Sequence, residues 1–523
     1  MVSLDMTNHA ETIALTTEIT TLKNRVKELE ILLKFYEEQF SLSKKRHFGA
    51  SSEKSEYDQL HIDSMGELGG FDIDPSDEEP DMEHIKSHYR KKKRTRADSL
   101  PKDIPAEEIV CELTLEERQC PECGKEMGPI GNEYREELVV IPAKTMIRRY
   151  AARTYICEEC SDSAEKTPIK KAKWPKPVIK GSFASPESIA YAAHQKFLMG
   201  VPLYRQEHEW RRRGVLLSRQ TMANWLIRSA EDWLKPIKDE LKRRLLLREV
   251  LHADETTFQV LKEPGKSPQS KSYLWCYRTS GDVDEPIVLA EYKPDRKTYN
   301  PSVFLNGYAG YLHADGYDGY HKLPPGIVVV GCWAHVRRKW DEALKIVKPA
   351  DREGCTAMIG KRYCDKLFAV ERDIASLDAG LRYEERLKRL KPLIDEFFQW
   401  ATTADAEARP KSSLGIAISY MFSQQQYLRN VLLDGRLELS NNRIERTIKP
   451  FVISRKNFLF ANTQRGADAA AIFFSLIETT KETGVDPFEY LTHVFKTAPN
   501  VDMSSPENLD ALLPTGYKKT YCP

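Results

Sequence analysis

The sequence has no long apolar run and almost no net charge. No stretch approaches the roughly twenty consecutive apolar residues that span a bilayer. The N-terminus, MVSLDMTNHAETIALTTEIT, lacks the basic start and apolar stretch of a secretion signal. With a formal charge of +1, any charge used to bind nucleic acid must be local. We therefore expect a cytoplasmic protein with no membrane partner.

Cysteine is also sparse. Ten cysteines among 523 residues are too few for a disulfide scaffold. The hydrophobic fraction of 41% and the aromatic fraction of 10% are those of a folded protein. The length exceeds what one compact core accommodates, so we expect about two to four domains.

Near the N-terminus, apolar residues recur in alternating steps of four and three from Leu15 to Phe40. This is a heptad seam, and its Ile and Val at early a positions with Leu at d favour a parallel dimer. A single amphipathic helix packed on its own chain is the alternative. We predict a coiled coil over residues 10–43, which would make the protein a homo-oligomer.

Residues 56–104 are expected to be a linker that is first acidic and then basic. Its acidic part is punctuated by Gly and Pro and has little to bury. The basic run YRKKKRTRADSLP follows it. That run is either a solvated stretch that balances the acidic part or an arm that contacts the DNA backbone.

Two Cys-x2-Cys pairs then flank a segment that alternates well enough for two strands. Each pair can chelate from a tight turn, and together they supply the four thiolates of a closed tetrahedral zinc site. A closed site would stabilise a small domain and would not be catalytic. We predict a zinc-ribbon-like finger over residues 105–170 that holds one structural Zn²⁺ and can contact DNA. The ligands would be Cys120, Cys123, Cys157 and Cys160.

Residues 185–247 have a helical pattern. Ser185 followed by Pro186 marks a helix start, a second helix ends at Gly214, and Ser218 caps a third. A helix, a short turn and a polar-faced helix have helix-turn-helix shape, although such hairpins are common without DNA. The residues predicted to contact DNA here are Arg211, Arg212, Arg213, Arg219, Gln220 and Asn224.

From residue 248 the pattern changes to strands, which later alternate with helices. A mixed sheet with helices on its faces is the expected fold of this part. Two of the strands carry the same four residues, LHAD, and end at Asp254 and Asp315. If these strands are neighbours, both carboxylates can share a divalent cation.

A third carboxylate, Glu445, lies in the basic segment SNNRIERTIKPF. With Asp254 and Asp315 it would give three hard oxygen ligands, which suit Mg²⁺ or Mn²⁺ better than zinc. Two such ions about 4 Å apart can activate a water or a 3′-hydroxyl and stabilise the leaving oxygen in phosphoryl transfer. We expect the two asparagines to cap the helix and to touch the DNA backbone, with the basic residues placing phosphates. These residues are Asn441, Asn442, Arg443, Arg446, Lys449, Arg455 and Lys456.

Each acid has a competitor nearby. The repeated LHAD context favours Asp254, the position at a strand end favours Asp315, and the basic context favours Glu445. The competing ligands are Glu255 for the first acid, Asp318 for the second and Glu438 for the third.

The order and wording of several segments resemble the large transposase of the insertion-sequence-66 family, a group of bacterial DDE transposases. The core segments are HADET, HADGYDGY, CWAHVRRK and the long run from LSNNRIERTIKPF to DPFEYL. HFGASSEKS, the paired-cysteine finger and LSRQTMANWL also resemble that family's segments in the same order. The resemblance covers nearly the whole chain.

This resemblance implies an RNase H-like core over residues 248–480, interrupted by a helical insertion at 341–434, and a C-terminal segment at 481–523. The fold class would be multidomain α+β. The resemblance also implies a triad of Asp254, Asp315 and Glu445, two Mg²⁺ ions, and cleavage and joining of element ends. The partners would be terminal inverted repeats, target DNA and accessory proteins of the same element, in the bacterial cytoplasm near the nucleoid.

Cys332 and His335 follow the strand IVVV with C-x2-H spacing. Two ligands are too few for zinc, so a structural pair at a strand–helix junction is the simpler interpretation. In related DDE families a similar pair is thought to support the core or to contact DNA, and we assign both residues a supporting role. Arg337, Arg338 and Lys339 follow as predicted phosphate contacts.

Two other functions remain open. A DNA-binding regulator with a decayed core would keep the finger and the helix-turn-helix, but the presence of all three acids argues against it. An RNase H-like nuclease that cuts without joining would not need a dimerising zipper and two DNA-binding modules.

Overall fold

The computed structural model describes most of the chain from residue 145 onward. Two compact units are formed, one by Met1–Asp81 with Thr154–Pro523 and the other by Met82–Arg153. The linker at 56–104 and all four cysteines of the predicted finger lie outside the described residues. These are residues 145–156, 169–171, 173, 175–281, 283–405 and 408–521, with scattered helical positions between 19 and 36.

The described positions between residues 19 and 36 are helical, as the heptad pattern predicts. The apolar seam residues among them are exposed, from 49% for Leu29 to 64% for Tyr36. An exposed apolar seam is what a coiled coil requires of one chain taken alone. The pairing of two chains stays a prediction. No helix in the described ranges has the length and apolarity needed to cross a membrane.

A helical region precedes the sheet, as predicted. Ser185 and Ser188 form a reciprocal capping box at its start. Ser218 accepts a hydrogen bond from the Thr221 N–H, and Gly214 has a φ of +78°, which ends the preceding helix. The elements are α3 (Pro186–Ala193), the π-helix η4 (His194–Leu198), α4 (Leu203–Arg212), α5 (Arg219–Ser229), the π-helix η5 (Ala230–Leu234) and α6 (Lys235–Leu245).

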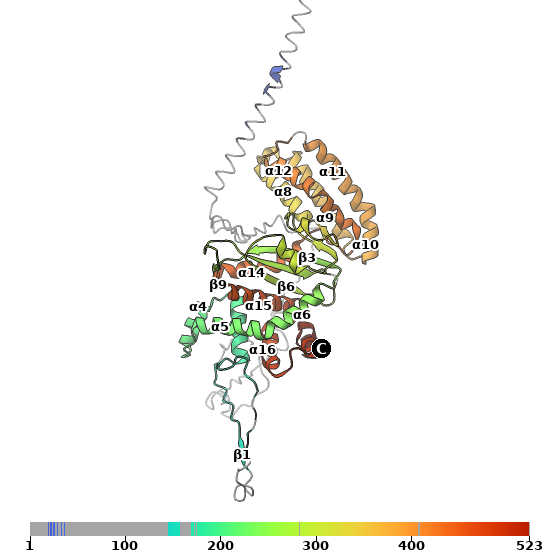
Figure 1. Ribbon diagram of the computed structural model, residues 1–523. Coiled ribbons are helices and arrows are strands. Elements are labelled where there is room, and N and C mark those ends of the chain that lie inside the picture. The colour runs from blue at the N-terminus through green and yellow to red at the C-terminus, as the bar shows by residue number, and fades with distance from the viewer. Residues whose placement is uncertain are drawn as a thin grey trace, which may run out of the picture. The chain divides into compact units, whose positions relative to one another are not determined.

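Strands between residues 250 and 330 form a five-stranded mixed sheet in the order β6-β5-β3-β7-β8. Figure 1 labels β3 and β6 of this sheet. The first three strands pair antiparallel, whereas β3, β7 and β8 run parallel. The mixed sheet predicted from the pattern is confirmed. The strands are β3 (Val250–Thr257), β5 (Tyr273–Thr279), β6 (Val288–Lys293), β7 (Gly310–His313) and β8 (Ile327–Val330), with α7 (Tyr299–Phe304) between β6 and β7.

Two long helices cover one face of the sheet, α14 (Asn442–Phe458) and α15 (Gln464–Glu482) (Figure 1). Their apolar residues, including Ile448 and Phe474, pack with buried residues of β5 and β6. The edge strand β6 is also tied to α15, since its Val288 N–H donates to the Thr479 hydroxyl over 3.0 Å. This bond occupies an edge that would otherwise be open to pairing. A small parallel pair joins β4 (Val260–Lys262), which follows β3 in the chain, to β9 (Ala461–Thr463), which lies between α14 and α15.

Helices separate β8 from α14, and the described residues between these two elements contain no strand. We call this part the helical insertion; its first helix begins at Trp333, before the predicted start at residue 341. It has its own apolar core, built around Trp333, Trp340 and Phe397. Arg386 is fully buried in it and pairs with Glu371. The helices are α8 (Trp333–Ile346), α9 (Thr356–Asp373), α10 (Ala379–Glu385), the π-helix η8 (Arg386–Leu390), α11 (Lys391–Asp405), α12 (Ser413–Ser423), α13 (Gln425–Arg429) and the 3-10 helix η9 (Asn430–Leu433).

The C-terminal helices return to the helical region that precedes the sheet. Tyr490 and Val494 of α16 (Pro487–Thr497) share an apolar core with Ile189 and Ala193 of α3. Lys496 also pairs with Glu187 over 3.0 Å. The chain ends in α17 (Pro506–Leu512) and α18 (Pro514–Tyr521).

Candidate functional site

The two LHAD segments lie side by side and in register. His252 on β3 is the pairing partner of His313 on β7, and the two strands are parallel. Asp254 and Asp315 each come two residues after these histidines, so they lie at neighbouring positions along the two strands. The predicted strand end at Asp254 was wrong, because β3 continues to Thr257 and pairs Asp254 with Cys276 of β5. The condition set by the sequence, that the two strands be neighbours, is met.

Glu445 joins the two aspartates from α14, which packs across the sheet. All three acids lie close enough for Asp315 and Glu445 to act electrostatically on Asp254. Burial first, and then Glu255, Asp315 and Glu445, raise the pKa of Asp254 well above its ordinary value. Burial also raises the pKa of Asp315. A buried group of carboxylates whose pKa values rise together favours the binding of cations or protons.

The donor set fits a hard divalent cation. Asp254 is 1% exposed and Glu445 is 3% exposed. The Oδ1 atom of Asp254 accepts the Glu255 N–H over 2.8 Å. Its Oδ2 atom is buried and receives no hydrogen bond from the described residues. A buried carboxylate oxygen with unused lone pairs, beside two further carboxylates, suits Mg²⁺ or Mn²⁺.

The competing acids have other partners. Glu255 accepts hydrogen bonds from the Tyr320 hydroxyl over 2.7 Å and from Arg296. Asp318 is 71% exposed and pairs with Lys322. The Oε1 atom of Glu438 accepts a hydrogen bond from the Arg443 Nε–H over 2.6 Å. Each of these three acids is thus held by partners outside the group of Asp254, Asp315 and Glu445, although Glu255 lies close enough to raise the pKa of Asp254.

Cys332 and His335 lie beside Glu445, at the start of α8. One ligand atom from each of the three residues falls within 4.8 Å of the others. The Cys332 Sγ atom accepts the Asn441 N–H over 3.2 Å, and burial raises the pKa of Cys332 to about 12. Burial lowers the pKa of His335 to about 3. The pair thus sits as a neutral thiol and imidazole at the strand–helix junction, in contact with the third acid.

The structure divides the residues predicted to contact DNA into exposed and structural ones. Arg337 is buried and pairs with Asp365 of α9 over 2.7 Å. The Arg455 side chain donates to the Thr257 hydroxyl over 2.7 Å. Lys339 pairs with Glu342 over 2.9 Å. The exposed residues are Arg211, Arg212, Arg219, Gln220, Asn224, Arg446 and Lys456. The partly exposed residues are Arg213, Arg338, Arg443 and Lys449.

The two asparagines before Glu445 do not reach solvent. Asn441 is 1% exposed and Asn442 is 5% exposed. Asn441 is at the N-cap position of α14, as predicted, but its side chain makes no capping hydrogen bond. Its amide bonds to His252 and to the Ala253 carbonyl instead. The predicted capping bond was therefore wrong, because long-range partners on β3 compete for the same side chain.

Two cations lie beside the acids in positions that the sequence did not predict. Arg296 lies 3.9 Å from the Asp315 carboxylate and also pairs with Glu255. Arg338 was predicted only as a phosphate contact, yet its guanidinium lies 3.9 Å from Glu445. Arg296 stands outside every motif in the sequence, so no local signal marked it.

Family models match four successive parts of the chain. A model described as "Transposase IS66 family" matches residues 181–469, and "IS66 C-terminal element" matches residues 475–515. A "zinc-finger binding domain of transposase IS66" matches residues 117–161, which include the four predicted zinc ligands. "Transposase C of IS166 homeodomain" matches residues 36–109.

Similar proteins occur in Sinorhizobium fredii (strain NBRC 101917 / NGR234). "Uncharacterized protein y4qI" is 30% identical over 415 residues, which cover 76% of this chain and 73% of the relative. "Uncharacterized protein y4jD" is 26% identical over 467 residues, which cover 87% of this chain and 88% of the relative. Taken with the family matches, these findings identify the chain as a member of the IS66 transposase family.

Proposed function

We propose that this protein is a DDE transposase that cleaves the ends of its insertion sequence and joins the freed 3′ ends to target DNA. The observation that carries the proposal is the convergence of Asp254, Asp315 and Glu445. They come from two adjacent parallel strands and a helix far along the chain, and Asp315 and Glu445 both raise the pKa of Asp254. Buried acids whose charges oppose one another are costly without a function.

The catalytic region is proposed to have an RNase H-like fold. The observed sheet supports this, with three antiparallel strands followed by two parallel ones in the order β6-β5-β3-β7-β8. The acids lie on the central strand β3, after its parallel neighbour β7, and on α14, which packs on the sheet. The helical insertion enters between the second and third acids.

The three carboxylates would hold two Mg²⁺ or Mn²⁺ ions, with Glu255 as a neighbouring acid. When bound, such ions activate a water or 3′-hydroxyl and stabilise the leaving oxygen of an in-line displacement. The protein's own residues would do the rest. Asp254 offers its buried Oδ2 atom, Arg296 restrains Glu255 next to Asp315, and Arg338 offers a guanidinium beside Glu445 for a phosphate oxygen.

Other parts of the chain would bind DNA and assemble the complex. The exposed face of α5, with Arg219, Gln220 and Asn224, suits contacts to terminal inverted repeats. The four cysteines within residues 117–161 would bind one structural Zn²⁺. The exposed seam of the N-terminal helix would pair two chains and bring two ends together. Target DNA and accessory proteins of the same element complete the proposed partners.

A labelled duplex carrying the element's ends tests the proposal. Cleavage should occur with Mg²⁺ and stop with EDTA, and Glu445→Gln should abolish cleavage while DNA binding remains. A pre-cleaved end supplied with target DNA should be joined, which a simple nuclease would not do. Binding without cleavage by the wild type, with the element's other products added, would overturn the proposal and favour a regulator with a decayed core.

A further inference from the structure

The histidines of the two LHAD segments form a buried pair beneath the acids. His252 and His313 are each 0% exposed. Their rings stack with centroids 4.3 Å apart and an interplanar angle of 13°. Each ring comes two residues before an aspartate of the proposed metal site. A contact that fixes the two rings therefore also fixes the neighbouring segments of β3 and β7 that lead to Asp254 and Asp315.

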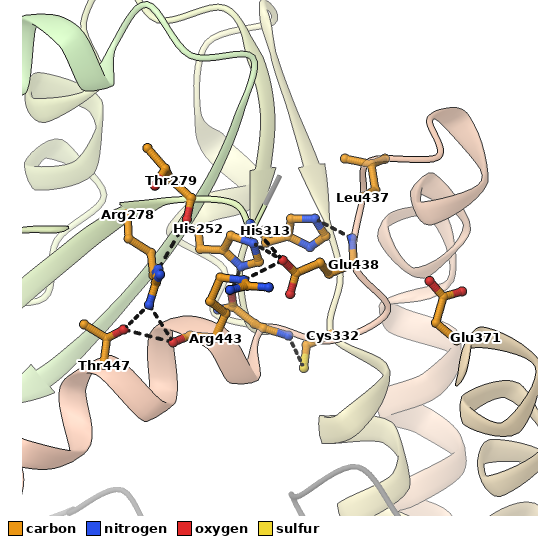
Figure 2. Close-up of polar contacts among 12 residues, drawn as sticks. His252, Arg278, Thr279, His313, Cys332, Glu371, Leu437, Glu438, Arg443 and Thr447 are labelled. Carbon is orange, nitrogen blue, oxygen red and sulfur yellow. Dashed lines mark hydrogen bonds and ion pairs between the residues drawn. The ribbon is translucent and has the colours of Figure 1, made fainter. Parts of the chain in front are cut away.

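A segment that we call the strap, residues 434–441, crosses this histidine pair. The Glu438 N–H donates to the Nε2 atom of His313 over 3.1 Å. The Asn441 side chain bonds His252 Nδ1 through its oxygen over 2.9 Å, and its Nδ2 atom donates to the Ala253 carbonyl over 3.0 Å. Figure 2 shows the strap's Glu438 facing both histidines. One residue of the strap thus grips each LHAD segment.

These bonds define what the rings do. Because the Asn441 Nδ2 atom donates to Ala253, its oxygen must accept from His252, so Nδ1 of His252 carries the proton. His313 accepts at Nε2, which requires a neutral ring. Each ring therefore uses one nitrogen to hold the strap.

The strap leads directly into the helix that carries the third acid. Asn441 is the N-cap residue of α14, four positions before Glu445. At about 1.5 Å of rise per residue, this places Glu445 one helical turn from the grip. The Asn441 N–H also donates to Cys332 Sγ over 3.2 Å, which fixes the same residue to the start of α8.

The other end of the strap is held by the helical insertion. Arg386, fully buried, donates to the carbonyl oxygens of Asp434, over 2.9 Å, and of Leu437. The strap is therefore anchored to the insertion at its start and to the LHAD histidines at its end. These anchors restrict the conformation of the strap and of the start of α14.

We propose that Asn441 and Glu438 are positioning residues that set Glu445 against the two aspartates by gripping the stacked LHAD histidines. This rests on the proposed function, because it concerns the ligands of the same metal site. Partners that orient metal ligands typically change metal affinity by about 10- to 100-fold when they are removed. The grip is therefore expected to act on metal affinity.

The full-length protein should be titrated with Mn²⁺ while the free ion is followed by electron paramagnetic resonance. The sites that count are those that Glu445→Gln removes. Asn441→Ala should weaken them by about 10-fold or more, while Asn441→Asp, which keeps the oxygen that bonds His252, should recover part of the affinity. Half-maximal Mn²⁺ for cleavage should rise by the same factor.

Asn430→Ala is the matched control. Asn430 donates its Nδ2 to the Val329 carbonyl over 2.7 Å, a bond of the same kind between the insertion and the sheet that does not involve the histidines. Its Mn²⁺ affinity should stay within about twofold of the wild type, since it holds no metal ligand in place. If Asn441→Ala fails to fold, His252→Phe keeps an aromatic ring in the stack. It removes the bond to Asn441 together with the 3.6 Å approach of His252 Nε2 to Glu438.

The outcomes separate the two proposals. Mn²⁺ binding by the wild type that is equal in Asn441→Ala and His252→Phe would overturn the positioning role and leave the metal site intact. An equal loss of affinity in Asn430→Ala would overturn it as well, because general loosening would then explain the effect. No Mn²⁺ binding in the wild type would overturn the proposed function and the positioning role together.

Discussion

Arg386 donates a hydrogen bond to the carbonyl oxygen of Asp434 over 2.9 Å, and through it the helical insertion holds the segment that leads to Glu445. The same guanidinium pairs with Glu371 and is fully buried. The insertion is thus fastened to the segment before α14 by a buried charge and by peptide carbonyls, in addition to apolar packing. This makes its stability sensitive to a single side chain.

Replacing Arg386 by Met should destabilise the protein by about 3–5 kcal/mol, because the partly buried Glu371 and several carbonyls lose their donor. Urea unfolding of the full chain measures this free energy. Arg389→Met, three positions later, removes a pair with Asp373 whose side chains are 38% and 60% exposed. That change should cost less than about 1 kcal/mol. Similar losses in both variants would contradict the assigned role of Arg386.

Asp315 and Asp318 provide a direct test of which acid in the glycine-rich turn is the ligand. Asp315→Asn should reduce cleavage by more than about a hundredfold, since even indirect partners of a metal ligand cost up to that much. Asp318→Asn should leave cleavage within about twofold, because Asp318 is an exposed partner of Lys322. Cleavage of end-labelled duplex with Mg²⁺ gives both rates. The reverse order would assign the second acid to Asp318.

The pH dependence of stability should reveal the buried acids. Burial, and then Asp315, raise the pKa of Glu255 to about 7. In the unfolded chain a glutamate has a pKa of about 4.3. Because the folded pKa is the higher one, this group's contribution to stability falls as pH rises from about 4.3 to about 7.

Glu255→Gln removes the loss of stability that the ionisation of Glu255 causes as pH rises. The free energy of unfolding of the variant relative to the wild type should therefore increase with pH, by about 1.4 kcal/mol for each unit of pKa difference. Urea unfolding in EDTA at about pH 4.5 and about pH 7.5 measures the change. Although burial opposes it, His252 and Arg443 hold the pKa of Glu438 below its ordinary value. Its contribution to stability is then lost only below about pH 4.3, so Glu438→Gln should show almost no slope between these two pH values. Equal slopes would refute the assignment.

Much of the site followed from the sequence because its information is local and repeated. Two LHAD segments on strands predicted that Asp254 and Asp315 can lie close together, and a register that pairs His252 with His313 agrees. Cap residues Ser185 and Ser218 likewise placed two helix starts correctly. Patterns of this kind depend on residues within a turn or a strand of one another.

The sequence could not show which side chains bond to residues that lie far away in the chain. Asn441 has the residue type and position of a helix cap, yet it bonds His252, which lies 189 positions away. Arg337 stands in a basic run, yet it pairs with Asp365 inside the insertion. In both cases a partner on another element outweighs the local preference, because leaving a buried polar side chain unpaired costs more than losing a cap or a solvated charge.

The N-terminal seam predicts self-association. Leu22→Lys should weaken it at least about a hundredfold, because two leucines, one from each chain, would each lose about 1.5 kcal/mol or more of burial. Sedimentation velocity over a range of concentrations measures the change. Thr21→Lys adds the same charge at a neighbouring helical position outside the seam and should have little effect. A wild-type chain that stays monomeric would favour a helix packed on its own chain.

Zinc content provides the last test, since residues 117–161 match the zinc-finger model of the family. Four thiolates at tetrahedral spacing bind Zn²⁺ with about 10–16 kcal/mol at neutral pH, so the purified chain should retain about one zinc through dialysis. Cys157→Ser leaves three thiolates and should lose the metal, as measured by inductively coupled plasma mass spectrometry. Cys355→Ser is the control, because Cys355 is a free cysteine of the helical insertion and should not affect zinc content. Zinc retained in full by Cys157→Ser would exclude Cys157 as a ligand. Loss of zinc with unchanged Mg²⁺-dependent cleavage of a pre-bound end would show that the finger serves DNA binding or folding and takes no part in the chemistry.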